Sequence, residues 1–349
     1  MLNYLEKRSA RGRGEFRSLI EQFLTDEGID LDIGGAGLFR YPPHFGILNT
    51  LAKPEIDVGR LKGIIFDFDE QNQSELKLTS NEEIVLPNIG TLKCLKDEIT
   101  IDGTTDRLDA LQSEGHIQLS RNHLIAAGRI SVLAGCDPFI RESISGSGEG
   151  CEFLAPTRDV MEKFEEAVAM IEELSPQMYG IIFDHVRYLV VFRGDPNAPS
   201  YADLAYQGAI FINLDRTTTV PALASDILHQ TAHVFLTMAT FDSDALFLIP
   251  AEEQIGSLLG GKDRRPLYGA FHGLFTAYVE AEFCSLWLKR AKDLAHGPIG
   301  QMTDLLQNKM ESFQRDLQIF RRLEREGILT PDGNEILKQY DSSKLEIVL

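Results

Sequence analysis

Several residue types that mark large classes of protein are scarce in this chain. Its four cysteines are far apart and form no CxxC pair, which is typical of reduced thiols and not of a disulfide framework. The cysteines are Cys94, Cys136, Cys151 and Cys284. No apolar run approaches the roughly 18 residues that a membrane-spanning helix needs, and the first residues lack the apolar core of a signal peptide. We therefore expect a cytoplasmic protein with no membrane partner.

Positive charge is also scarce. The 349 residues include 34 lysines and arginines against 53 aspartates and glutamates, which gives a formal net charge of −19. Because nucleic-acid-binding proteins present a basic surface to phosphate groups, we expect no nucleic-acid partner. The apolar fraction of 43% is that of a globular protein with a large core, and the length suits one or two domains.

Hydrophobic patterns and turn residues predict an α+β fold. Runs rich in β-branched and aromatic residues predict strands at residues 63–69, 83–86, 98–101, 181–183, 188–192 and 208–214. Apolar residues at helical spacing predict helices over 156–174, over about 18 residues after Pro221, over 263–296 and over 305–323, and a short helix from 331. We expect a mixed-sheet N-terminal half and a mainly helical C-terminal half that binds a metal.

A serine- and glycine-rich segment at residues 143–150 predicts a flexible connection and the boundary between two domains. Residues 1–150 are then an N-terminal α/β region. Residues 151–349 are the domain that carries the chemistry.

His229 and His233 lie four residues apart in a segment predicted to be helical. Positions i and i+4 lie on one face of a helix, where two neutral imidazoles can bind one metal ion. The spacing is that of the HExxH motif of zinc hydrolases, but Gln230 replaces the glutamate. A glutamine amide cannot take a proton from metal-bound water near neutral pH, which favours a redox metal over hydrolytic zinc. Alternatively, the pair lies on an ordinary helix without a metal, since roughly 0.2 such pairs are expected by chance.

A second histidine segment follows, Arg264-Arg265-Pro266-Leu267-Tyr268-Gly269-Ala270-Phe271-His272-Gly273. The proline suits the first turn of a helix. Gly269 and Gly273 flank His272, and each weakens a helix by roughly 1 kcal/mol relative to alanine. We expect that another helix or a ligand approaches closely at these glycines.

The segment Leu228-His229-Gln230-Thr231-Ala232-His233, followed by this RPL…HG element, resembles the HExxH-type 2-oxoglutarate-dependent peptide β-hydroxylases. These are non-haem iron enzymes that modify ribosomally made peptides. The resemblance covers roughly residues 156–340, and residues 1–150 match no family. It implies Fe(II) held by His229, His233 and His272, with 2-oxoglutarate as cosubstrate and O2 as oxidant. It also implies a precursor peptide that is hydroxylated at a side-chain β-carbon. Gln230 departs from the motif, and beside the ligands it would hydrogen-bond a bound group.

The far carboxylate of 2-oxoglutarate needs a fixed cation, and the planar fork of arginine matches a carboxylate. Arg265 lies seven residues before His272, which is about 10 Å along a helix axis, so we expect both to face one cavity. Arg264 is the alternate. The other interpretation of either arginine is a surface salt bridge or a contact at the start of the helix.

Two other functions fit part of the pattern. A zinc metalloprotease would use Glu253, 20 residues after His233, as its third ligand, but losing a general base costs roughly 10²–10⁴ in rate. A non-catalytic scaffold would only bind a peptide, and residues 1–150 are the candidate peptide-binding region. No histidine is followed two positions later by aspartate or glutamate, which excludes the HxD/E arrangement of jelly-roll oxygenases. The sequence does not determine the oligomeric state or the peptide that is modified.

Overall fold

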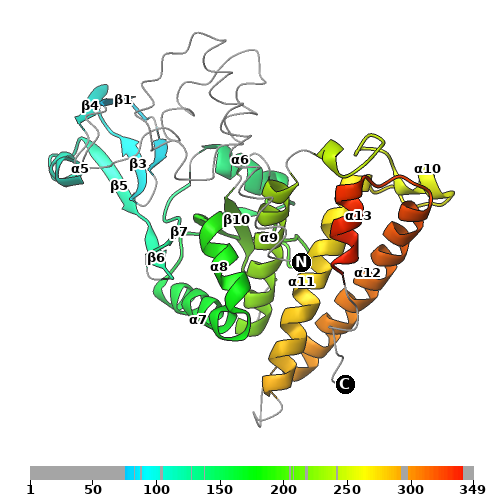
Figure 1. Cartoon of the computed structure of the whole chain (residues 1–349). Helices are drawn as coiled ribbons and strands as arrows, with labels where there is room; N and C mark the ends of the chain where they lie inside the picture. Colours follow the sequence, from blue (N-terminus) through cyan, green and yellow to red (C-terminus); the bar gives the residue numbers. More distant parts are fainter. Residues whose placement is uncertain are drawn as a thin grey trace. The chain divides into compact units, whose positions relative to one another are not determined.

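The computed structural model describes residues 75–340 apart from 82, 87–88, 103–104, 127, 137, 204–205, 207, 217–218, 241–242 and 292–297. This part divides into two compact units (Figure 1). The helical unit comprises described residues within 170–182 and 219–340, and the sheet unit comprises those within 75–169 and 183–218. Residue 150, the expected domain boundary, lies inside the sheet unit. The strand predicted at 63–69 lies outside the described residues. So do residues 1–74 as a whole, which form the first half of the candidate peptide-binding region.

The first half of the sheet unit contains two small antiparallel sheets among its described residues. One pairs β1 (Glu75–Thr79) with β4 (Glu98–Asp102), and the other has the strand order β2 (Glu83–Leu86), β3 (Gly90–Cys94), β5 (Ile117–Arg121). The strands predicted at 83–86 and 98–101 are therefore confirmed. Helix α5 (Thr105–Ser113) contacts β5. Alternate apolar side chains of β3, β4 and β5 point to one face, as the pleat of a strand requires. They form a common core with Leu108 and Leu111 of α5 and Leu78 of β1.

The larger sheet of this unit is mixed. Its strands are β6 (His123–Ile125), β7 (Ile130–Val132), β8 (Glu152–Phe153), β9 (Tyr188–Arg193) and β10 (Ala209–Asn213). Both β7 and β10 run parallel to β9, whereas β8 pairs with β9 and β6 pairs with β7 in the antiparallel sense. The first five residues of β9 and all of β10 are buried, which is why both predicted strands are continuous apolar runs without alternation.

The prediction of a flexible connection at residues 143–150 is wrong for residues 143–146, which are helical. Helix α6 covers Pro138–Gly146, and its Ile140 and Ile144 are buried in a core with Phe192 and Phe211. The two isoleucines lie four residues apart on one helical face, so their burial outweighs the preference of the neighbouring serines and glycines for a loop.

Two helices follow β8 along the chain. The helix predicted at 156–174 is confirmed as α7 (Arg158–Leu174). The strand predicted at 181–183 is wrong, because these residues belong to α8 (Pro176–His185). Met178, Ile181 and Ile182 are buried, and their spacing of three and four residues places them on one face of a helix. A short apolar run does not distinguish a strand from a buried helix.

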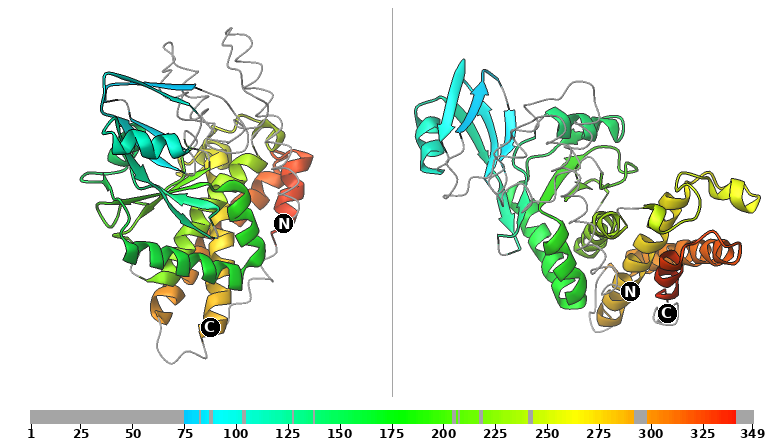
Figure 2. Two further views of the ribbon diagram at one scale, coloured as in Figure 1. Left: turned by 90° about the vertical axis from the view of Figure 1, so that its left-hand side faces the viewer. Right: turned by 45° about the horizontal axis from the view of Figure 1, so that its top comes forward.

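The helical unit positions the candidate site. Its elements are α9 (Val220–Ala239), the 3₁₀ turn η2 (Ser243–Ala245), α10 (Ile255–Leu259), α11 (Leu267–Ala291), α12 (Ile299–Arg325) and α13 (Pro331–Lys338). The two longest, α11 and α12, lie side by side (Figures 1 and 2). They run antiparallel, because the pairs Phe271–Phe320 and Tyr278–Phe313 are in ring contact, each with centroids 5.4 Å apart. This aromatic packing fixes the relative position of the two helices.

The signals at the helix starts had different outcomes. Thr219 caps α9 by accepting a hydrogen bond from the backbone of Ala222, and Pro221 lies in the first turn, as predicted. By contrast, α11 begins at Leu267 and not at residue 263. A proline disfavours helical backbone at the residue before it, so Pro266 keeps Arg265 outside the helix.

The described residues thus have the predicted α+β fold, with a mixed sheet in the first half and helices in the second. In this part of the chain, no helix combines the length and the apolar character that crossing a membrane requires.

Candidate functional site

The structure brings the three predicted metal ligands together in the helical unit. His229 and His233 lie on α9, and His272 lies on α11. Nε2 of His233 is 3.2 Å from Nε2 of His229, and Nδ1 of His233 is 3.2 Å from Nδ1 of His272. The rings of His233 and His272 are stacked, whereas the ring of His229 is turned by 70° from that of His233.

The cluster forms because α9 and α11 run antiparallel along facing sides. At the end of α9, the hydroxyl of Thr240 lies 2.8 Å from that of Tyr268, near the start of α11. The ring of Tyr268 meets His272 edge-on, with centroids 4.5 Å apart. At the other end of this contact, His229 faces Glu280. The two motif histidines lie on one face of α9, as the i, i+4 spacing predicts, and this face is the one that meets α11.

Glu280 is the centre of the polar contacts behind His229. Its Oε2 lies 2.5 Å from Nδ1 of His229 and forms an ion pair with Lys309 of α12. Its Oε1 accepts a hydrogen bond of 3.3 Å from the hydroxyl of Ser225, one turn before His229. Only 3% of Glu280 is exposed. Burial alone would raise its pKa, but His229 and Lys309 hold the pKa of this carboxyl below its ordinary value.

Two of the histidines are neutral at pH 7. Burial, together with the adjacent His229 and His272, lowers the pKa of His233 well below its ordinary value. Burial lowers the pKa of His272 to about 4. Neutral imidazoles are the form that binds metal ions. A metal ion can therefore bind without displacing protons from imidazolium forms of these two residues.

For three neutral imidazoles, the carboxylate determines the direction of every hydrogen bond. Ionised Glu280 can only accept, so Nδ1 of His229 donates to it and Nε2 of His229 carries a lone pair. Nε2 of His233 then donates to His229, and Nδ1 of His233 accepts from His272. The last lone pair is on Nε2 of His272, which is buried without a hydrogen-bond partner among the described residues. An unsatisfied group of this kind costs about 1–3 kcal/mol.

The Nε2 atoms of His229 and His233 are spaced as for one metal ion, which both can bind once the hydrogen on Nε2 of His233 moves to its Nδ1. Two nitrogens that each lie about 2.1 Å from one ion, at about 100° to each other, are about 3.2 Å apart, which is the observed Nε2–Nε2 distance. Metal-bound histidines almost always donate their other ring N–H to an acceptor such as a carboxylate, as His229 does. His272 meets the other nitrogen of His233. Within the described part, no set of three or more histidine, cysteine, aspartate or glutamate side chains is arranged to hold an ion. The third ligand therefore stays a prediction.

Gln230, at the position of the motif glutamate, is buried, with 3% of the residue exposed. Its amide nitrogen donates to Oδ1 of Asp226, one turn earlier on α9, at 3.4 Å. A role in contacting a bound group stays a prediction.

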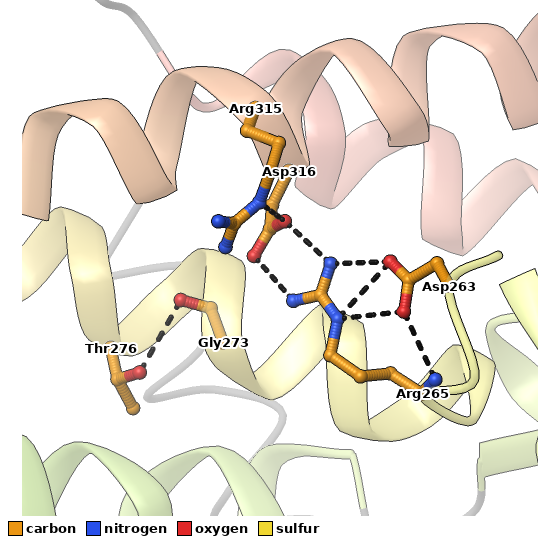
Figure 3. A network of polar contacts seen from close by, with 6 residues as sticks. All are labelled: Asp263, Arg265, Gly273, Thr276, Arg315 and Asp316. Atoms are coloured by element: carbon orange, nitrogen blue, oxygen red, sulfur yellow. Dashed lines mark hydrogen bonds and ion pairs between the residues drawn. The ribbon is translucent and has the colours of Figure 1, made fainter.

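The two arginines of the second segment differ. Arg264 is exposed. Arg265 pairs with Asp263 and with Asp316 of α12 (Figure 3). Its Nη1 and Nη2 contact the two oxygens of Asp316 at 2.9 and 2.8 Å, and its Nε and Nη2 contact Asp263. Hydrogen bonds to the two carboxylates raise the pKa of Arg265, and Arg315 also contacts Asp316. The interpretation of Arg265 as a salt-bridge residue at the start of a helix is thus confirmed, and its binding of 2-oxoglutarate stays a prediction.

The two glycines beside His272 meet neighbours at different distances. A Cβ on Gly273 would lie 3.4 Å from Oδ2 of Asp316 and 3.7 Å from Nη1 of Arg265, which is ordinary contact. A Cβ on Gly269 would lie 3.2 Å from Cγ of Pro266, which is tight. The near neighbour of Gly269 is thus a proline beside the start of the same helix, and not the other helix or ligand that was expected. Gly273 does face another helix, through Asp316 of α12, but only at ordinary contact distance.

The substitution Gly273→Ala is expected to raise the free energy of unfolding by about 0.5–1 kcal/mol, because it adds a helix-favouring methyl group in available space. Urea denaturation of the two proteins measures the change. Gly269→Ala is the matched control and should gain less or lose stability. If Gly273→Ala destabilises the protein by more than Gly269→Ala does, the space at Gly273 is smaller than the structure indicates.

Sequence reasoning missed Glu280, Lys309 and Ser225. A signal existed for Glu280, since it is a charged residue in an apolar helical run, eight residues after His272 and so near the same face. Ser225 lies four residues before His229 and shares its face. No signal separates Lys309 from the other charged residues of the amphipathic α12.

No protein-family model matches this chain, and no curated protein matches it.

Proposed function

We propose that this protein is an oxygenase that uses Fe(II), 2-oxoglutarate and O2 to hydroxylate a side-chain β-carbon of a ribosomally made precursor peptide in the cytoplasm. The observation that supports the proposal most directly is the pair of Nε2 atoms of His229 and His233, 3.2 Å apart, with the Glu280 carboxylate behind His229. The cosubstrate and the peptide substrate come from the resemblance of the motif and of the RPL…HG element.

In this proposal His229 and His233 hold the ion, and His272 supplies the third nitrogen. Imidazole ligands suit Fe(II), and three of them leave coordination positions open. Bound Fe(II) supplies the oxidation: one atom of O2 enters the C–H bond of the peptide and the other enters succinate, while 2-oxoglutarate loses CO2. The chain itself holds the imidazoles of His233 and His272 neutral by burial, and Tyr268 packs against the ring of His272.

The proposed cosubstrate cation is Arg265, with Arg264 as the alternate. Arg265 already pairs with two carboxylates of unequal exposure, since the side chain of Asp263 is 27% exposed and that of Asp316 is 2% exposed. A cosubstrate carboxylate bound by Arg265 would therefore replace Asp263, while the buried pair with Asp316 stays intact.

The zinc metalloprotease alternative gains no support. Such an enzyme needs a general base at position 230, and the buried amide of Gln230 is bonded to Asp226. Glu253, its candidate third ligand, is exposed. No observation specifically favours the non-catalytic scaffold.

Anaerobic titration with Fe(II), with and without 2-oxoglutarate, tests the proposal. We expect a weak visible charge-transfer band that saturates at one equivalent of iron only when 2-oxoglutarate is present. The variant His229→Ala should abolish the band. The variant His123→Ala, which removes an exposed histidine of the sheet unit, is the matched control and should leave the band unchanged.

The reaction itself is tested by succinate formation from a library of precursor peptides. Succinate should exceed the peptide-free background only when peptide, Fe(II) and 2-oxoglutarate are all present. Bound iron without the band, or with a band that survives in His229→Ala, would overturn the proposal.

A further inference from the structure

We infer that Glu280 and Lys309 are positioning residues of the metal site. Lys309 holds the carboxylate of Glu280 as an acceptor, and Glu280 fixes the tautomer of His229 that leaves Nε2 free for an ion. The inference rests on the proposed metal-binding function of His229 and His233. It assigns a role in metal affinity to two residues that are not themselves ligands.

The geometry joins three helices at one carboxylate. Glu280 of α11 receives Ser225 and His229 from α9 and Lys309 from α12. His229 and Lys309 share the same oxygen, Oε2, while Ser225 occupies Oε1. With donors on both oxygens, the carboxylate plane cannot turn without breaking a contact.

The burial of Glu280 shows why all of these partners matter. An isolated carboxylate in an apolar interior is very costly, so buried charges are paired and hydrogen-bonded. Glu280 and Ser225 are almost fully buried, and the side chain of Lys309 is only 23% exposed. If Glu280 only joined α11 to α12, its ion pair with Lys309 would be sufficient. The additional contact with Nδ1 of His229 indicates that the carboxylate also positions this imidazole.

The direction of the hydrogen bond follows from the chemistry of the donors. An ammonium group has three N–H donors and no acceptor, so Oε2 of Glu280 must accept from Lys309. The hydrogen between the same oxygen and His229 then belongs to Nδ1 of the imidazole. In its neutral form, which is the form that binds a metal ion, His229 carries one hydrogen. With that hydrogen on Nδ1, Nε2 has the lone pair, and it lies 3.2 Å from Nε2 of His233.

The isosteric variant Glu280→Gln removes the negative charge behind His229, a charge that raises the basicity of this ligand, and replaces one acceptor oxygen by an NH2 donor. Because Lys309 can only donate, it keeps the amide oxygen at the position of Oε2 in this variant. The NH2 group can turn towards Nδ1 of His229, and so favour hydrogen on Nε2, when Lys309 is replaced as well, as in Glu280→Gln with Lys309→Met. The variant Lys309→Met removes the donor that holds Oε2 in place, whereas Lys309→Arg keeps a donor at this position.

Two measurements test the inference on the full chain. The first is the affinity for Co(II), followed by its visible d–d bands under anaerobic conditions. Loss of an outer partner of a metal-bound histidine typically lowers affinity about 10- to 100-fold, so we expect this loss for Glu280→Gln and Lys309→Met, with Lys309→Arg restoring most of the affinity. The exposed carboxylate Glu311 of α12 provides the control Glu311→Gln, which should bind Co(II) like the unsubstituted protein.

The second measurement is the tautomer of His229 in the metal-free protein, read from long-range ¹H–¹⁵N NMR correlations of the imidazole. We expect hydrogen on Nδ1 in the unsubstituted protein and a changed pattern in the double variant Glu280→Gln with Lys309→Met. A role limited to helix packing would change the melting temperature and leave this pattern unchanged.

The outcomes separate the two proposals. Failure of the unsubstituted protein to bind Co(II) would overturn the proposed function, and this inference with it. Tight binding that is unchanged in Glu280→Gln and Lys309→Met would overturn the inference alone. If Glu280→Gln does not fold, the comparison of Lys309→Met with Lys309→Arg decides the question. Equal affinities of these two variants for Co(II) contradict the inference, whereas a higher affinity of Lys309→Arg supports it.

Discussion

The substitution Arg265→Met is expected to lower the free energy of unfolding by about 3 kcal/mol, because it leaves the buried carboxylate of Asp316 without its main partner. Asp316 is 1% exposed and receives two hydrogen bonds from Arg265. This loss of stability is at the lower end of the range of about 3–5 kcal/mol for breaking a buried ion pair, because Arg315 still donates to Asp316 at 3.0 Å. Chemical denaturation measures the change.

The neighbouring Arg264→Met is the matched control. It removes the same charge one residue earlier from an exposed side chain, and we expect a change within about 0.5 kcal/mol. The double variant Arg265→Met with Asp316→Leu should regain much of the lost stability, because replacing both members of a buried pair by apolar groups is often neutral or stabilising. Equal stability of Arg265→Met and Arg264→Met would show that Arg265 does not stabilise the buried carboxylate of Asp316.

The same variants address 2-oxoglutarate binding. If Arg265 only joins α12 to the start of α11, the folded Arg265→Met protein keeps its affinity for 2-oxoglutarate. If it also binds the far carboxylate, the affinity falls in Arg265→Met, and it stays unchanged in Asp263→Asn or rises because a competing carboxylate has gone. Binding is measured through the visible band of the iron complex at increasing 2-oxoglutarate.

Acidification of the metal-free protein is expected to be strongly destabilising because His272 is buried and neutral. Its pKa is lowered to about 4 in the folded protein, against about 6.5 in the unfolded chain. The unfolded state therefore binds more protons between these values, so stability is fully present above pH 6.5 and is lost as the pH falls towards 4. The contribution of His272 alone between pH 7 and pH 4.5 is about 2–3 kcal/mol. Burial lowers the pKa of His233 as well, which adds to the effect in the same direction.

Urea denaturation at both pH values, with a chelator present, measures this dependence. The variant His272→Leu removes the titrating group, and its loss of stability on acidification should be smaller by about 2 kcal/mol. Removal of an exposed histidine by His123→Leu should leave the dependence unchanged. If the free energy of unfolding falls equally on acidification in His272→Leu and in the unsubstituted protein, burial does not hold His272 neutral.

The regular elements of this fold are largely predictable because their signals are local. Thr219 and Pro221 predict the start of α9 through cap geometry, and the continuous apolar runs of β9 and β10 predict buried strands. The errors occur where local preference and burial disagree. Ile140 and Ile144 are buried on one face of α6 despite the neighbouring glycines and serines. Residues 181–183 are helical because the buried Met178, Ile181 and Ile182 follow a helical spacing.

By itself, the sequence determined the α+β class, the helix that carries His229 and His233, and the presence of both on one face. These follow from periodicity, since the geometry of a helix relates residues only a few positions apart. Only the tertiary structure decided which groups meet this face: the ring of His272 at one end and the carboxylate of Glu280, paired with Lys309, at the other. It also decided that Arg265 pairs with Asp316 on α12. These partners are 39, 51 and 51 residues apart in sequence. Contacts at such separation depend on how the helices pack, because side chains rather than local periodicity set the register between α9, α11 and α12.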